Sequence, residues 1–369
     1  MGTSTSLWPL AEHTKGKHAV LKSYLDAWLP ILSKFRGRVL IIDGFAGPGR
    51  YSGGEEGSPL IAIRCVREHT ASAMISEVVC LFIEADKTNA DHLEAALEEL
   101  RADGKIPTKC KCRVLHGDFD EGLAKVLDYV DEQKKRLAPA FVMIDPFGVS
   151  QTPMSVIQRL FTNDKVEVYV SFMYEWVNRF KKSSAFEPHL DELFGTDEWR
   201  DGLTIEDPQE RKTFFFDLYE DQLRKAGAKY VVRFELFSGN RLKYAIFFAT
   251  CHLLGADKMK QAIWKIAPTG DYAFRGGRSE QLALDLEAPD FGPLRRAIKG
   301  FLGDRKVGSW VKVEEVAEFV VANTDYHSSQ FKTNALRPLE SNGKIEVDPT
   351  SRTRKGSYPD GTRLRLKRD

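Results

Sequence analysis

Two short apolar runs, far apart in the chain, each end in an aspartate followed by turn residues. Residues 39–42 lead into Asp43-Gly44-Phe45-Ala46-Gly47-Pro48-Gly49, and residues 141–144 lead into Asp145-Pro146-Phe147-Gly148. A short, wholly apolar run bounded by turn residues is typical of a buried strand in a parallel sheet. In an open α/β sheet, ligands bind beyond the carboxyl ends of the strands, where the strand order reverses. We therefore expect the two clusters to face one crevice.

The order of the glycines separates the ligands that the first turn could hold. Gly44, Gly47 and Gly49 allow positive φ angles and a close approach of backbone to ligand. Dinucleotide-binding enzymes use G-x-G-x-x-G, with the pyrophosphate at a helix N-terminus, whereas this turn reads D-G-x-x-G-x-G. S-adenosylmethionine (SAM) has no pyrophosphate, and a carboxylate favours the ammonium at its methionine end. The order favours SAM, with a glycine-rich turn that binds nothing as the alternative.

The next two predicted strands also end in acids. Residues 79–83 precede Glu84, which we expect to accept hydrogen bonds from both ribose hydroxyls. Residues 112–115 precede Asp118, suited to the adenine amino group, and Phe119, suited to stacking on the ring. A helix N-cap is the alternative role for each acid, but four successive strands that end in acids are hard to explain by caps alone. The predicted cofactor-binding residues are Asp43, Gly44, Phe45, Ala46, Gly47, Gly49, Glu84, Asp118 and Phe119.

Charge and cysteine usage narrow the class of protein. The chain has 54 Lys and Arg against 53 Asp and Glu, so any nucleic-acid surface must be local. No apolar run is long enough to span a membrane, and the polar start does not resemble a secretory signal. The cysteines are odd in number and mostly lie in apolar strands, which indicates free thiols in a reducing cytoplasm. Cys110-Lys111-Cys112 has no second pair, so we predict no metal site.

Alternating strand and helix patterns predict a parallel, doubly wound α/β sheet. The predicted helices cover residues 20–28, ending before Pro30, and 58–66, 88–100 and 119–137. Strands at 230–237 and 243–250 are so close that they must form an antiparallel hairpin. Methyltransferase sheets end in such a hairpin. We therefore predict a Rossmann-like class I SAM-dependent methyltransferase fold with a seven-stranded sheet over residues 1–267, carrying a helical insertion at 172–207.

The remaining residues predict a linker and a second domain. Glycine, proline and charged residues over 268–293 indicate the linker. Within 294–369, helices at 294–302, 313–321 and 328–341, the last bent or shortened by Pro338, precede strands at 345–347 and 362–366. This order predicts a winged helix-turn-helix domain. Its basic hairpin contains Arg352, Arg354 and Lys355, which we expect to bind nucleic-acid phosphates. A protein-interaction module of the same shape is the alternative.

The second strand-tip loop resembles the D/N-P-P-Y/F loop of amino-methylating nucleobase methyltransferases. That resemblance implies that Asp145 and a backbone carbonyl accept hydrogen bonds from an exocyclic amine, while an aromatic ring stacks on the flipped base. The sequence departs from the pattern because Phe147 stands where the second proline would be, and Gly148 stands where the aromatic would be. The predicted catalytic residues are Asp145, Pro146 and Phe147.

A wider resemblance covers most of residues 13–267. This part of the chain is similar to the three-Cys-motif partner family, TcmP. The motifs that carry the resemblance are His13-Thr14-Lys15, Lys17-His18, Asp43 to Gly49, Gly57-Ser58-Pro59, Asp145 to Gly148 and Ala249-Thr250. This implies a bacterial methyltransferase-like protein with a winged-helix-like C-terminal region, and a protein partner that carries a three-cysteine motif. The opening segment is also similar to the front helix of ribosomal-RNA adenine-N6 methyltransferases, which implies that Lys17 and His18 bind substrate, with solvated surface residues as the alternative.

Together these features predict a SAM-dependent methyltransferase that acts on a nucleobase or nucleotide, with the winged helix aiding substrate binding. The alternative is a non-catalytic protein that binds SAM or a nucleotide, together with nucleic acid or a neighbouring protein.

Overall fold

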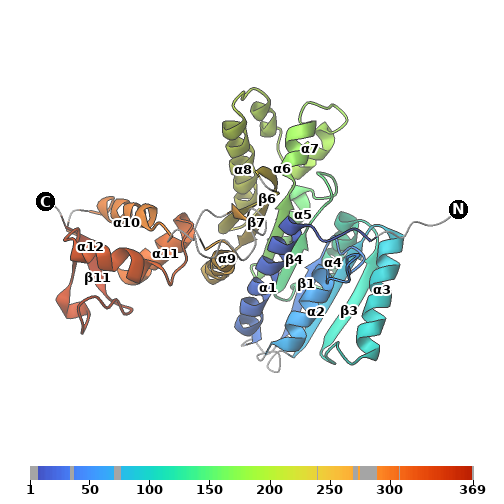
Figure 1. Ribbon diagram of the computed structural model, residues 1–369, viewed down its shortest axis with the longest axis horizontal. Coiled ribbons are helices and arrows are strands. Elements are labelled where there is room, and N and C mark those ends of the chain that lie inside the picture. Colours follow the sequence, from blue (N-terminus) through green and yellow to red (C-terminus); the bar gives the residue numbers. More distant parts are fainter. Residues whose placement is uncertain are drawn as a thin grey trace. The chain divides into compact units, whose positions relative to one another are not determined.

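The computed structural model describes residues 7–33, 37–69, 76–238, 240–268, 273–274, 289–306 and 308–367 (Figure 1). These residues fall into two units. The first runs to Gly255 and includes a short strand at 273–274, and the second begins at Ala256. Among the described helices, none combines the length and apolar character needed to cross a membrane.

The first unit is built on one sheet with the strand order β3-β2-β1-β4-β5-β7-β6-β8. Strands β1 to β5 pair in parallel, and β7 pairs antiparallel with both β5 and β6. This order, with an antiparallel strand inserted beside β5, is that of the class I methyltransferase fold, so the predicted fold is confirmed. Strand β8 pairs with β6 and adds an eighth strand to the predicted seven. The strands are β1 (Arg38–Asp43), β2 (Glu77–Glu84), β3 (Cys110–His116), β4 (Ala140–Ile144), β5 (Val166–Phe172), β6 (Tyr230–Ser238), β7 (Arg241–Thr250) and β8 (Ala273–Phe274).

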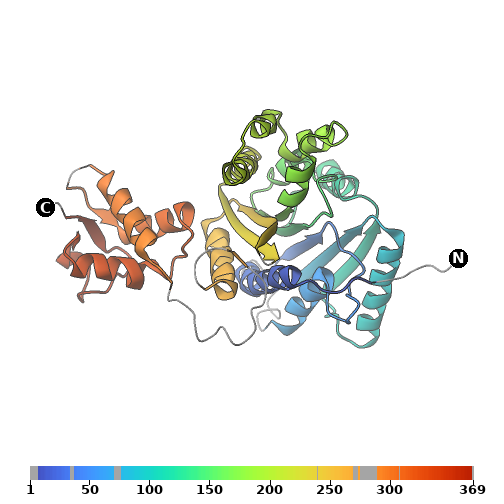
Figure 2. The ribbon, with the colours of Figure 1, turned by 45° about the horizontal axis from the view of Figure 1, so that its top comes forward.

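Helices cover both faces of the sheet (Figure 2). One face carries α1 (Glu12–Ser33), α2 (Ser58–Glu68) and α3 (Lys87–Ala102). The other carries α4 (Phe119–Glu132), α5 (Met154–Leu160), α8 (Pro208–Lys225) and the predicted insertion, which is helical: α6 (Tyr174–Phe180), α7 (Glu187–Phe194) and the 3-10 helix η2 (Glu198–Leu203). Helix α1 continues through Pro30, where the prediction ended it, and α4 ends before the predicted limit.

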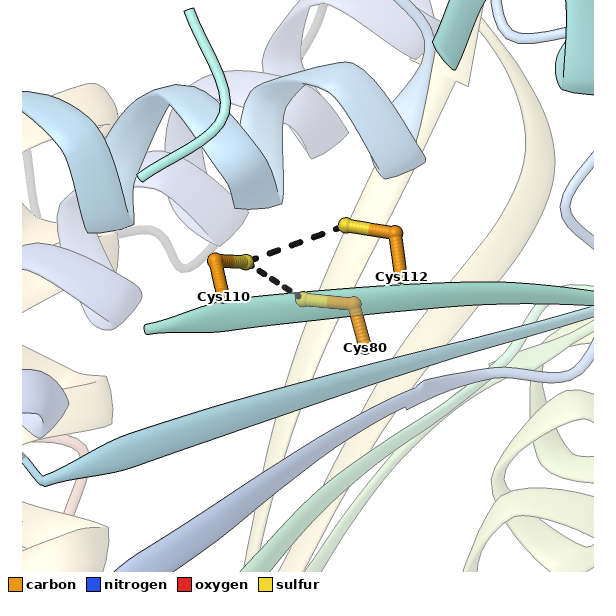
Figure 3. A group of neighbouring side chains, drawn as sticks. All are labelled: Cys80, Cys110 and Cys112. Atoms are coloured by element: carbon orange, nitrogen blue, oxygen red, sulfur yellow. Dashed lines mark hydrogen bonds between the residues drawn. The ribbon is translucent and has the colours of Figure 1, made fainter. Parts of the chain in front are cut away.

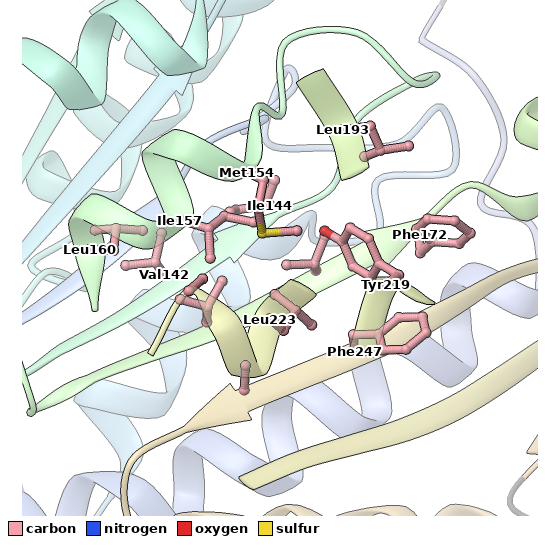
Figure 4. Packing of buried hydrophobic residues seen from close by; sticks show 14 of the residues in the cluster. Val142, Ile144, Met154, Ile157, Leu160, Phe172, Leu193, Tyr219, Leu223 and Phe247 are labelled. Atoms are coloured by element: carbon pink, nitrogen blue, oxygen red, sulfur yellow. The ribbon is translucent and has the colours of Figure 1, made fainter. Parts of the chain in front are cut away.

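The core explains why the strand tips are held firmly. Strands β4 and β5 are buried at every position, because helices exclude water from both faces of a parallel sheet. On the face that carries α4, α5 and α8, Val142 and Ile144 pack against Met154 of α5 and Tyr219 of α8 (Figure 4). The loops after β4 and β5 therefore start from well-packed strand ends.

The second unit contains a small antiparallel sheet of order β10-β11-β9 with helices around it. Strand β9 was not predicted. The third predicted helix begins at residue 331, later than predicted, and continues through Pro338 to Ser341, with a π-helical segment directly before α12. The linker predicted over 268–293 lies largely outside the described residues. The elements are α10 (Gly292–Gly303), β9 (Val311–Lys312), α11 (Val313–Asn323), the π-helical turn η4 (Lys332–Leu336), α12 (Arg337–Ser341), β10 (Ile345–Val347), the 3-10 turn η5 (Pro349–Ser351) and β11 (Arg363–Leu366).

Helix α9 (Leu253–Ile266) belongs mainly to the second unit, whereas the sequence prediction ended the first domain at residue 267. The Lys260 ammonium donates a hydrogen bond to the Val321 carbonyl at 2.6 Å. The Trp264 indole donates to the Asp325 carbonyl at 2.9 Å. These bonds attach the helix to the end of α11 and the residues after it.

Candidate active site

A cavity of about 450 Å³ lies at the carboxyl end of the first unit's sheet. Its walls come from the turns after β1, β2 and β4, from the start of α4 and from the N-terminal segment. The order of the strands reverses between β1 and β4, which is where α/β sheets bind ligands. The two strand-tip clusters therefore face one cavity, as expected. The lining residues are Trp8, Gly44, Phe45, Glu84, Ala85, Asp86, Asn89, Phe119, Pro146, Phe147, Gly148, Ser150 and Gln151.

The glycine turn needs its glycines for two different reasons. A Cβ atom on Gly44 would lie 2.3 Å from the Phe119 ring, so the backbone passes directly against that side chain. Gly47 and Gly49 have φ angles of +63° and +80°, which side chains disfavour. The Phe45 ring also packs against Phe119, with centroids 5.5 Å apart. The turn and the first residue of α4 thus form one wall of the cavity.

Glu84 connects the glycine turn to the end of β2. Its Oε2 accepts a hydrogen bond from the Gly47 N–H at 2.7 Å, and its Oε1 accepts one from the Asp86 N–H at 2.9 Å. The Ala46 N–H donates to the Ile83 carbonyl at 3.0 Å in the same region. A carboxylate oxygen has two lone pairs, so each oxygen of Glu84 keeps an acceptor site for a ligand. The carboxylate is therefore held in position by the backbone alone.

Asp43 lies beneath the glycine turn and is 1% exposed. Its Oδ1 accepts a hydrogen bond from the Phe45 N–H at 3.2 Å, but its Oδ2 has no partner among the described residues. Burial raises the pKa of Asp43 to about 7. A buried carboxylate oxygen without a partner is costly, so a cationic group at this position would be favoured.

Asp118 is the N-cap residue of α4, but its side chain makes no cap hydrogen bond. Its Oδ1 instead accepts a hydrogen bond from Gln151 Nε2 at 2.7 Å. Gln151 lines the cavity and has a φ angle of +67°, an uncommon conformation for a residue with a side chain. Sequence reasoning missed Gln151, because no motif marks it and its backbone conformation is visible only in the structure.

Lys17 of α1 forms an ion pair with Asp145, across 128 positions of sequence. The two side chains are 8% and 25% exposed. Burial alone would raise the pKa of Asp145, but the Lys17 ammonium more than offsets this and lowers it below its usual value. The same pairing raises the pKa of Lys17 despite its burial. The acid of the second loop is therefore ionised and can only accept hydrogen bonds.

Two histidines of α1 lie beside this ion pair. His18 packs near the Tyr51 ring and His13 near the Tyr244 ring, with centroids 5.8 and 5.5 Å apart. Burial, together with the Lys17 charge, lowers the pKa of His18 to about 3 and also lowers that of His13. Both imidazoles are therefore neutral at pH 7. Lys17 and His18 are buried, which excludes the alternative that they are solvated surface residues.

Exposed aromatic side chains form a rim beside the cavity. Phe147 is 70% exposed, and its ring meets that of Trp8 edge to face with centroids 5.6 Å apart. Trp176 of α6 is also exposed and lies close to Gly148. Pro146, between Asp145 and Phe147, is buried. Sequence reasoning selected Phe147 but missed both tryptophans, because neither lies in a recognisable motif.

The second unit requires a correction to the predicted phosphate contacts. Arg352 is ion-paired with Glu340, its Nη1 donating to Oε2 at 2.9 Å, and its side chain is 8% exposed. The Tyr358 hydroxyl donates to the same Glu340 oxygen at 2.6 Å. Arg352 thus fastens the hairpin to α12 and is not available to a phosphate. Arg354 and Lys355 are exposed, so their predicted role in binding nucleic acid stays a prediction.

Comparisons with known proteins found no matching family model and no matching curated protein. Among solved structures, protein LPL1258 of Legionella pneumophila, from the family DUF519, is 13% identical, with 63% of this chain and 85% of that chain covered and a TM-score of 0.37. An O-methyltransferase from Bacillus cereus in complex with S-adenosylhomocysteine is 14% identical, covering 62% and 80%, with a TM-score of 0.33. The METTL16 methyltransferase domain is 13% identical, covering 61% and 66%, with a TM-score of 0.30. The fold assignment rests on the strand order and not on these distant likenesses.

Proposed function

We propose that this protein transfers a methyl group from SAM to a nucleobase, either in a nucleic acid or in a nucleotide. One observation carries the proposal: the glycine turn, the Glu84 carboxylate and the Asp145 loop meet at a single cavity where the strand order reverses. We also propose, from the sequence resemblance, that the chain is a member of the TcmP family.

The cavity residues fit SAM group by group. The volume of about 450 Å³ falls within the range of small-ligand sites. Asp43 does not line the cavity, but its unpartnered oxygen lies beneath the glycine turn and suits the ammonium of the methionine end. The remaining acceptor sites of Glu84 suit the ribose hydroxyls, and the Phe119 ring offers a flat apolar face to the adenine. When bound, SAM supplies an electrophilic methyl group on its sulfonium.

The second loop would orient the acceptor. Because Lys17 keeps Asp145 ionised, Asp145 can accept a hydrogen bond from an exocyclic amine and fix the direction of its nitrogen lone pair. The exposed Phe147 ring is available to stack on the base. Orientation of donor and acceptor is the main catalytic contribution expected of these residues.

Cofactor binding is tested first, by calorimetry with SAM and S-adenosylhomocysteine. The wild-type chain should bind both, and a hundredfold excess over the dissociation constant should stabilise the fold by about 2.7 kcal/mol. Glu84→Ala should weaken binding because it removes the ribose acceptor. Glu121→Ala, which changes an exposed acid of α4, is the matched control. Tight binding of NAD without binding of SAM would contradict the proposal.

Methyl transfer is tested with labelled SAM and a panel of RNA, single-stranded DNA, duplex DNA and free nucleotides. Asp145→Ala should abolish transfer while the affinity for S-adenosylhomocysteine stays nearly unchanged, because acceptor orientation and cofactor binding are separable. Undiminished transfer by this variant would remove Asp145 from the mechanism. A wild-type chain that binds SAM but methylates none of the panel would instead support the non-catalytic partner protein.

A further inference from the structure

The thiols of Cys80 on β2 and of Cys110 and Cys112 on β3 lie close together (Figure 3). Glu84 ends β2, and Asp118 follows β3. The Cys110 sulfur lies 3.7 Å from that of Cys80 and 3.8 Å from that of Cys112. All three sulfurs lie within 4.8 Å of one another. Cys80 is opposite Cys112 in the ladder, and Cys110 and Cys112 are two positions apart on one strand, so all three side chains point to the same face.

These separations are those of sulfurs around a single metal ion. A metal–thiolate bond is about 2.3 Å long, which places two sulfurs on one ion roughly 3.8 Å apart in a tetrahedral arrangement and roughly 4.0 Å apart in a trigonal one. The distances from the Cys110 sulfur to the other two fall close to these values without any movement of the strands. The pairing of β2 with β3 therefore already sets two of the three distances, and the third, between the Cys80 and Cys112 sulfurs, lies within 4.8 Å.

The ligand set indicates which ion the thiols would select. Thiolates are soft ligands that favour Cu(I) and Zn(II). Structural zinc sites almost always have four ligands, and among the described residues no histidine, acid or further cysteine completes this group. Cys80, Cys110 and Cys112 are 0%, 6% and 9% exposed, so the cluster is shielded from bulk water. Three thiolates satisfy Cu(I).

We propose that Cys80, Cys110 and Cys112 form a binding site for one soft, three-coordinate metal ion, Cu(I), which lies outside the candidate active site and does not depend on the proposed methyl transfer.

A cation lies beside the cluster. The Arg101 guanidinium donates a hydrogen bond to the Cys112 carbonyl at 3.1 Å. Binding of Cu(I) by three thiolates releases the protons of the thiols, so the affinity should rise with pH.

The test is an anaerobic titration of the reduced full-length protein with Cu(I), in competition with a Cu(I) chelator. We expect one ion per chain, a thiolate-to-copper charge-transfer band in the ultraviolet, and weaker binding of Zn(II). Cys110→Ala removes the sulfur that contacts both others and should lower the Cu(I) affinity by an order of magnitude or more. Cys65→Ala, which changes a buried cysteine outside the cluster, is the matched control and should leave the affinity unchanged.

Several results would overturn the site. They are the absence of a charge-transfer band in the wild type, equal Cu(I) affinity in a folded Cys110→Ala variant, or an equal loss in Cys65→Ala. Tighter binding of Zn(II) than of Cu(I) would overturn the assignment of the ion. If circular dichroism shows that Cys110→Ala does not fold, Cys112→Ala takes its place. The stoichiometry and the spectrum of the wild-type protein decide independently whether the thiols bind copper.

Discussion

Among single residues, Asp43 and Glu167 are both buried acids whose pKa is raised to about 7, chiefly by burial, yet their surroundings differ. Glu167 accepts hydrogen bonds from the hydroxyls of Tyr24 and Thr250 at 2.5 and 3.2 Å. Asp43 keeps one oxygen unpartnered beneath the glycine turn. Glu167 therefore joins α1 to the sheet, whereas Asp43 keeps an acceptor oxygen free, as the proposed binding of an ammonium group requires.

The raised pKa of Asp43 predicts a pH-dependent cofactor affinity. Below about pH 7 the free protein holds a proton on Asp43, and binding of an ammonium group requires that proton to leave. The dissociation constant for SAM should therefore fall by up to about tenfold per pH unit between pH 5 and 7, and then level off. Calorimetry across this range checks the slope. Asp43→Asn should bind more weakly with no such slope, and a slope that persists in this variant would assign the proton to another group.

The positions of the strand-tip acids could be predicted because a strand tip can be recognised from a few neighbouring residues. Asp43 and Glu84 are the last residues of β1 and β2, and Asp145 directly follows β4. Arg352 was misassigned because its partner Glu340 comes from another element, and only the tertiary fold brings the two together. Gln151 and the exposed tryptophans were missed for the same reason.

Among the elements, the glycine turn needs Gly44 for space and Gly47 for its positive φ angle, and substitutions can separate these two requirements. Gly44→Ala should destabilise the fold by about 1–3 kcal/mol, because the added methyl group would meet the Phe119 ring at 2.3 Å. Gly47→Ala meets no atom within 4 Å, so it should cost only the strain of its positive φ, about 1 kcal/mol. Urea unfolding of both variants measures the difference. Equal losses would show that the turn moves to accept a side chain at Gly44.

Most elements could be predicted from pattern, because apolar runs and helical periodicity depend on nearby residues. The antiparallel position of β7 followed from the short connection between β6 and β7, and this connection also indicated the fold. Strand β9 is only two residues long and carries no pattern of its own. Pro30 does not end α1, which continues to Ser33. The placement of α9 is a tertiary effect.

For the whole molecule, a formal net charge of +1 means that affinity for nucleic acid must come from a local patch. Replacing Arg354 and Lys355 together with alanine should make the negative slope of log affinity against log salt shallower by ~0.7 to 0.9 for each phosphate that the variant no longer neutralises. Both side chains are exposed, so the stability of the fold should not change. Fluorescence anisotropy with labelled RNA and DNA at several salt concentrations measures the slope. An unchanged slope would favour the alternative that the second unit is a protein-interaction module.

Arg352→Ala provides a contrast to that double variant. In this variant Glu340 keeps its hydrogen bond from the Tyr358 hydroxyl but loses its cationic partner. In the wild type the side chains of Arg352 and Glu340 are only 8% and 12% exposed. Breaking a buried ion pair from one side typically costs about 3–5 kcal/mol. This variant should therefore lower the unfolding midpoint of the second unit, and any decrease in nucleic-acid affinity should follow that unfolding.

Helix α1 is made early in synthesis, but its partners are made late. Lys17 cannot pair with Asp145, nor Tyr24 with Glu167, until the later residue has been synthesised, 128 and 143 positions further along the chain. At translation rates of about 5–20 residues per second, the delay is roughly 7 to 30 seconds. Throughout this time Val20 and Leu21, which become fully buried, lack the strands β5 to β7 that complete the sheet. A nascent chain that stalls before β5 therefore exposes an aggregation-prone amphipathic helix. The yield of folded protein should depend on the chaperones that bind nascent chains at the ribosome.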